Sequence, residues 1–149
     1  MPSLQDVINA VRDAADQEPD TMVTLTLSAD DTKWLQILPD KINLAYPYEN
    51  PPLEQLTAFG IANIEIAAVG FFEPGLFADF DTSAMSVQQM SEFLTAYLAT
   101  AFGTVDLDEY SVSFDVAERG TIVANSDHEF LRKIVQLKRY FEGRSPRKP

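Results

Sequence analysis

Residues 22–48, MVTLTLSADDTKWLQILPDKINLAYPY, decide the fold of this chain. Apolar and polar side chains alternate along residues 23–27, as they do in a strand that buries one of its faces. A polar turn at 28–32 leads to a second short strand at 33–38. A Pro39-Asp40 turn, in which proline presets φ, then leads to a third at 41–46. The stretch therefore predicts an antiparallel meander of three strands.

Helices and a second hairpin are predicted around the meander. The strongest helix signal is at residues 86–102, where Ser86 and Gln89 form a capping box, one face stays apolar, and Gly103 follows as a stop. The other predicted elements are helices at 3–17 and 51–59, a β-hairpin at 62–81 that turns at Glu73-Pro74-Gly75, and a strand at 110–116.

The last part of the chain is predicted to form a basic helix. Residues 121–125 form either a hairpin partner for strand 110–116 or an extended linker. Ser126 and Glu129 then make a capping box for a helix over 126–142. This helix carries an apolar stripe, and its other face bears Arg132, Lys133, Lys138 and Arg139. Residues 143–149 are expected to be a disordered basic tail.

The order of these elements predicts one α+β domain over residues 1–142. Its antiparallel sheet should have five or more strands and should pack against the helix at 86–102, because the wide apolar stripe of that helix needs a sheet to cover. A parallel βαβ core is not expected.

The sequence offers few residues for catalysis. It has no cysteine, and its one histidine, His128, stands where a polar residue at a helix start is the ordinary interpretation. Nucleotide-binding loops and the nucleophile elbow are absent from the sequence. Neighbouring acids, such as Asp79 with Asp81, are typical of solvated turns more than of calcium or magnesium sites. We therefore expect no enzyme activity, no metal and no organic cofactor.

Charge is distributed unevenly. The chain has a net charge of −12; residues 1–126 carry 20 acids and 4 bases, whereas residues 127–149 carry 3 acids and 7 bases. An acidic body repels nucleic acid and favours basic partners, although it could serve solubility alone. We expect no nucleic-acid partner. No signal peptide or membrane-length apolar run is seen, so we expect a cytoplasmic protein without a membrane partner.

Aromatic side chains are the best candidates for a binding surface. Trp34 lies on the strand face opposite to Leu35 and Ile37. It either lines a groove for a partner or lies in the core. The phenylalanines around the 73–75 turn either fill the core or form an exposed patch. The candidate partner-binding residues are Trp34, Tyr46, Tyr48, Phe71, Phe72 and Phe77.

The pattern resembles that of the type III secretion chaperone-like family, including its YbjN-like branch. The residues that carry the resemblance are WLQILPDKINLAYPY (34–48), L-x-x-L-x-x-F-G (53–60) and SVQQMSEFLTAYLATAFG (86–103). The resemblance implies a small acidic cytoplasmic protein, often a homodimer, that wraps an extended client segment over apolar patches without nucleotide. The strand and basic helix at 110–142 would be an extension of that fold.

Two functions follow as hypotheses. The first is a chaperone or adaptor that holds an extended or basic segment of another protein. The alternative is an immunity or antitoxin protein whose acidic surface blocks a basic toxin. Both depend on an acidic and apolar surface.

Overall fold

A computed structural model describes residues 3–13 and 21–116. The strand or linker at 121–125, the helix at 126–142 with His128, and the tail at 143–149 lie outside these residues. The described elements are α1 (Leu4–Asp13), β1 (Thr21–Leu27), β2 (Trp34–Ile37), β3 (Lys41–Ala45), α2 (Pro52–Ala58), β4 (Ala68–Glu73), β5 (Phe77–Asp81), α3 (Val87–Tyr97), the π-helical turn η1 (Leu98–Phe102), the 3₁₀ turn η2 (Leu107–Glu109) and β6 (Tyr110–Val116).

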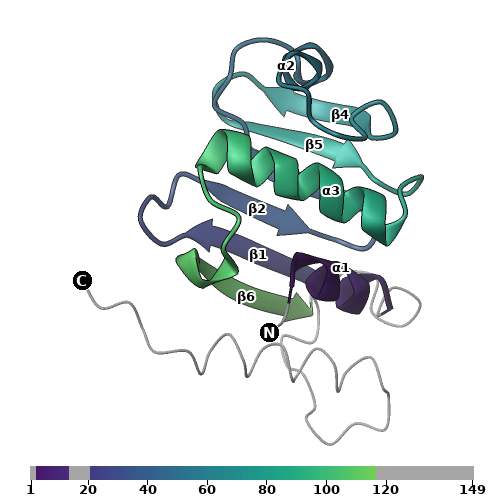
Figure 1. Cartoon of the computed structure of the whole chain (residues 1–149), viewed down its shortest axis with the longest axis vertical. Helices are drawn as coiled ribbons and strands as arrows, with labels where there is room; N and C mark the ends of the chain where they lie inside the picture. The colour runs from purple at the N-terminus through teal and green to yellow at the C-terminus, as the bar shows by residue number, and fades with distance from the viewer. Residues whose placement is uncertain (1–2, 14–20, 117–149) are drawn as a thin grey trace, which may run out of the picture.

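The strands form a six-stranded sheet in the order β4-β5-β3-β2-β1-β6, and every neighbouring pair is antiparallel (Figure 1). The predicted meander is confirmed as β1, β2 and β3. The predicted hairpin lies beside β3, and the predicted strand at 110–116 is β6, which pairs with β1. The fold is therefore α+β with an antiparallel sheet.

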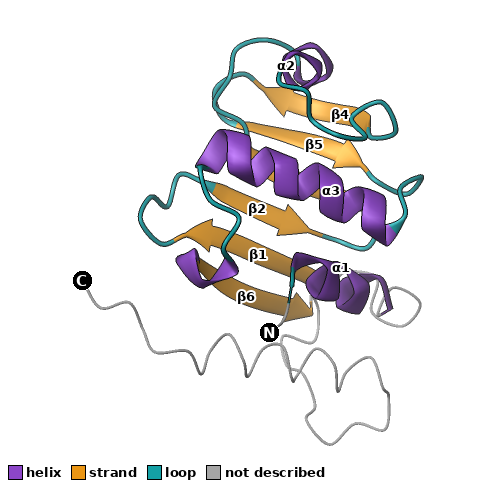
Figure 2. Cartoon of the chain, viewed as in Figure 1, coloured by secondary structure: helices purple, strands orange, loops and turns teal. Residues whose placement is uncertain are grey.

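Helices α1 and α3 lie over the same face of this sheet (Figure 2). The core between these helices and the sheet is apolar. The Phe80 ring of β5 packs edge-on against the Phe93 ring of α3, with 5.4 Å between the ring centroids. Tyr97 of α3 is buried, and its hydroxyl donates a 2.6 Å hydrogen bond to the Ala45 carbonyl on β3. These contacts fix α3 across the middle of the sheet.

The ends of α3 follow the sequence signals. Ser86 Oγ accepts from the Gln89 amide at 3.0 Å, and Gln89 Oε1 accepts from the Ser86 amide at 2.9 Å, which confirms the capping box. Beyond Tyr97 the predicted helix continues as η1 and ends at Gly103, whose φ is 87°. A side chain at that position would be strained in this left-handed conformation, so glycine is the natural stop.

The first strand of the predicted 62–81 hairpin was placed too early. The strand begins only at Ala68, and residues 62–66 form turns. Ile61, Ile64 and Ala67 are buried from these turns at a spacing of three, a spacing that a flat strand cannot give. The Asn63 side chain ties the segment to α3 by donating to the Gln89 carbonyl at 3.1 Å.

A half-buried cation joins α1 to the loop before α3. The Arg12 guanidinium donates to the carbonyls of Met85 and Thr82, the latter at 2.8 Å. Burial lowers the pKa of Arg12 from its ordinary value, and nearby Asp40 partly opposes this effect. The arginine therefore satisfies carbonyls that would otherwise lack donors in a partly dry site.

We expect Arg12→Ala to lower the free energy of unfolding by about 2–3 kcal/mol, because charged hydrogen bonds to two carbonyls are lost together. Urea denaturation measures the change. Lys33→Ala is the control, since its 3.5 Å ion pair with Asp30 is exposed and such pairs contribute about 0–1 kcal/mol. Equal effects of the two substitutions would contradict this account.

Candidate functional site

The sheet face opposite to α1 and α3 is the candidate binding surface. No helix within residues 3–13 and 21–116 covers it (Figure 2). Strand parity decides which side chains lie there, because successive residues point to opposite faces. Along β1 and β2 the burial alternates, with the buried residues facing the helices. Trp34 and Gln36 are therefore on the open face, as the sequence predicts for Trp34.

An apolar row crosses this face at one end of the strands. Trp34 of β2 lies beside Ala45 when the β2–β3 register is continued by one residue, and Ala45 pairs with Phe77 of β5. The Phe77 ring then contacts Phe71 of β4, with 5.7 Å between centroids. We call Trp34, Ala45, Phe77 and Phe71 the apolar row. It crosses four neighbouring strands, or about 14 Å.

A β-bulge in β4 brings Phe71 into the row. Val69 pairs with Phe80 and Phe72 pairs with Ala78, so one extra residue of β4 lies opposite Asp79. The bulge turns Phe71 toward the open face, while Phe72 stays on the helix side and contacts Tyr46. Phe71 is 64% exposed, and its contact with Phe77 makes it part of a contiguous apolar surface.

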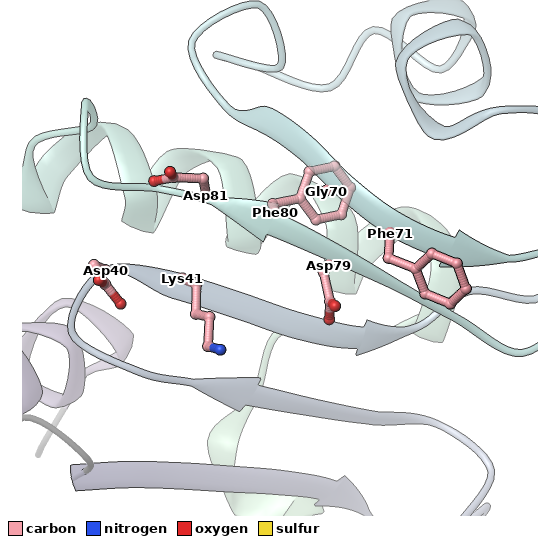
Figure 3. Close-up of a pocket in the computed structure, with 7 residues that line it drawn as sticks. All are labelled: Asp40, Lys41, Gly70, Phe71, Asp79, Phe80 and Asp81. Carbon is pink, nitrogen blue, oxygen red and sulfur yellow. The ribbon is translucent and has the colours of Figure 1, made fainter.

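An acidic hollow lies beside the apolar row. Its volume is about 190 Å³, and its lining residues, drawn in Figure 3, are Asp40, Lys41, Gly70, Phe71, Asp79, Phe80 and Asp81. Three of these are aspartates against a single lysine, so the hollow is net negative. Asp81 accepts from the Ser83 amide at 2.9 Å and from its hydroxyl at 2.7 Å, and these bonds lower the pKa of Asp81. The hollow therefore stays charged at neutral pH.

The six candidate partner-binding residues separate into two groups of three. Trp34, Phe71 and Phe77 meet on the open face. Tyr46, Tyr48 and Phe72 lie away from it, in an aromatic cluster with Phe59 in which ring centroids are 5.2–6.2 Å apart. Tyr46 is fully buried, and its hydroxyl donates to the Asn50 carbonyl. The structure thus supports the first group as surface residues and places Tyr46 in the core.

Sequence reasoning missed three residues of this surface: Ala45, Gly70 and Asp79. Ala45 and Asp79 belong to it through strand register, which periodicity within one strand does not reveal. Gly70 belongs to it through the bulge. A Cβ at Gly70 would stand 3.5 Å from the Asp79 Cβ and would narrow the hollow. An isolated glycine inside a strand pattern is the signal that could have indicated the bulge.

The acidic pairs elsewhere are turn residues. Asp30 accepts from the amide and hydroxyl of Thr32, and its pKa is lowered by these bonds. Asp106 caps η2 by accepting from the Asp108 amide at 2.9 Å. Among the described residues no group of three or more potential metal ligands is found, and no helix is long and apolar enough to cross a membrane.

Comparison with protein-family models, with curated proteins and with solved structures returned no match. The resemblance to type III secretion chaperone-like proteins therefore stays a prediction from the residues that carry it.

Proposed function

We propose that this protein is a non-enzymatic binding module, chaperone- or adaptor-like, that holds a segment of another protein on the open face of its sheet. The observation that supports this most directly is the apolar row with its exposed Phe71. Aromatic side chains in a shallow, uncovered surface are the usual anchors of protein interfaces.

The acidic hollow indicates the chemistry of the partner. Asp79 and Asp81 lie two and four residue pairs along the strands from the apolar row. A segment that places apolar side chains on the row would bring its flanking residues over these carboxylates, and lysine or arginine suits them best. Salt should weaken the encounter, since the Debye length is about 10 Å at 0.1 M.

The bulge in β4 favours binding on the face over binding at the edge. An extended segment that adds to a sheet needs an uninterrupted row of free backbone groups. β4 is an outer strand of the described sheet, and its pairing shifts between Val69 and Phe72. Bulges of this kind protect edges from strand addition. An antitoxin would need the acidic surface but not the apolar row, so the row favours a chaperone or adaptor.

We expect Phe71→Ala and Trp34→Ala each to weaken partner binding by about tenfold or more, as loss of an aromatic anchor does. The partner would be captured from the native host, identified by mass spectrometry, and titrated calorimetrically against the purified variants. Leu53→Ala is the matched control, because Leu53 is 53% exposed on α2, away from the open face. Undiminished affinity in both variants would contradict the proposal.

Thermal melting separates binding from folding for Trp34. The side chain is half-buried, so Trp34→Ala should lower the melting point much less than a core truncation does. The expected homodimer and cytoplasmic location remain part of this proposal. Light scattering tests the dimer against the 16.6 kDa mass of one chain.

A further inference from the structure

We propose that residues 126–142 of this same chain dock on the open sheet face, as an internal ligand lying over the apolar row and the acidic hollow. The docking does not depend on the proposed function. Only its consequence does: a partner segment would have to displace the internal one. Residues 126–142 lie outside the described residues, so the proposal uses only their amino-acid sequence.

The chemistry of this segment matches the face. Its apolar side chains recur at the spacing i, i+4, i+7 and i+11, which gives one continuous helical stripe: Phe130, Ile134, Leu137 and Phe141. Such a stripe is not stable in water by itself and needs an apolar surface to cover. The apolar row supplies one: Trp34, Phe71 and Phe77 lie on the open face, and no described helix covers them.

Charge complementarity points to the same occupant. Residues 127–149 carry 7 bases against 3 acids. Lys133 and Lys138 stand next to the apolar positions of the stripe, so a helix seated on the row can bring them toward Asp79 and the acidic hollow beside it (Figure 3). A second copy of the sheet face is a poorer occupant, because it would bring two acidic hollows together.

The chain is long enough for this arrangement. β6 ends at Val116, and the nine residues 117–125 can span roughly 30 Å when extended. Trp34, where the apolar row starts on β2, is level with Ser111, which is two strands away and five residues before Val116. The linker therefore has to span about 20 Å. A helix over 126–142 would be roughly 25 Å long, enough to cross the strands from β2 to β4.

Trp34 is the only tryptophan of the chain, so its fluorescence reports on the apolar row in the full-length protein. We expect the double substitution Lys133→Glu and Lys138→Glu to shift Trp34 emission to longer wavelength and to increase its quenching by acrylamide. Asp79→Lys should do the same. The three changes combined should restore part of the wild-type spectrum, because the new lysine at 79 attracts the new glutamates while Asp40 and Asp81 still repel them. Glu54→Lys, on the exposed side of α2, should leave the spectrum unchanged.

Several results would overturn the proposal. One is a Trp34 spectrum that does not respond to charge reversal at 133 and 138. Another is the absence of restoration in the combined variant. A response that depends on protein concentration would assign the cover to a second copy. If the variant with Lys133→Glu and Lys138→Glu fails to fold, Lys133→Gln with Lys138→Gln removes the same charges without adding carboxylates. An unchanged Trp34 spectrum in the glutamine variant counts equally against docking. Partner affinity in the Phe71→Ala variant tests the proposed function separately.

Discussion

Replacing Phe80 with alanine is expected to lower the free energy of unfolding by about 3–5 kcal/mol. Phe80 is fully buried on β5, between the sheet and α3, and its ring packs against Phe93. Truncation removes this edge-to-face contact and leaves a cavity beneath α3, where the capped helix cannot easily collapse. Urea or thermal denaturation measures the loss.

Phe71→Ala is the matched control for Phe80→Ala. Both residues belong to the same β4–β5 hairpin, but Phe71 is 64% exposed on the open face. Its truncation should cost clearly less stability than that of Phe80, because only the proposed docking of residues 126–142 would cover its ring. Comparable losses in the two variants would mean that the open face is covered more tightly than the described residues show, or that Phe80 is less important to the core than its burial implies.

The second large effect is expected at alkaline pH. Burial raises the pKa of Tyr46 and of Tyr110 to about 12, and it raises the pKa of Tyr97 further. In the unfolded chain these phenols titrate near their ordinary value of about 10. The folded state therefore holds protons that the unfolded chain releases. Their contribution to stability is complete below pH 10 and is lost as the pH rises toward 12.

We expect the free energy of unfolding to fall by on the order of 3–5 kcal/mol between pH 10 and pH 12. Urea denaturation at several pH values in this window measures it. Repulsion within an acidic chain also grows at high pH, so Tyr46→Phe is needed to isolate the phenol. That variant should lose a clear part of the pH dependence while keeping the aromatic cluster. A pH dependence identical to that of the wild type would contradict the assignment.

The signals that predicted the fold are local ones. The meander was predictable because both of its signals occur within a few residues of each other. One is the alternation of apolar and polar side chains along a strand, and the other is the turn residues between strands. The start of α3 was predictable because Ser86 and Gln89 satisfy each other within one turn. The strand at 62–67 was wrong for the same reason. Its residues alternate in the sequence, but they bury every third side chain by turning.

The candidate site depended on information that alternation does not carry. The bulge adds one residue to β4 and so reverses which of Phe71 and Phe72 faces the helices. Tyr46 continues the pattern of β3 into the core, and only the packing of Tyr48, Phe59 and Phe72 around it shows that it is enclosed. Trp34 was placed correctly because its strand is regular.

The pairing of β6 with β1 has a consequence for synthesis on the ribosome. Thr21 pairs with Val116, which is the last described residue. The backbone groups on the outer edge of β1 therefore gain their hydrogen-bond partners only after β6 has been synthesised. Until then the nascent chain can form the meander and the β4–β5 hairpin, but β1 offers free amides and carbonyls to any neighbouring chain. The interval between translation of residue 27 and of residue 116 is thus the period in which this protein is most exposed to mispairing.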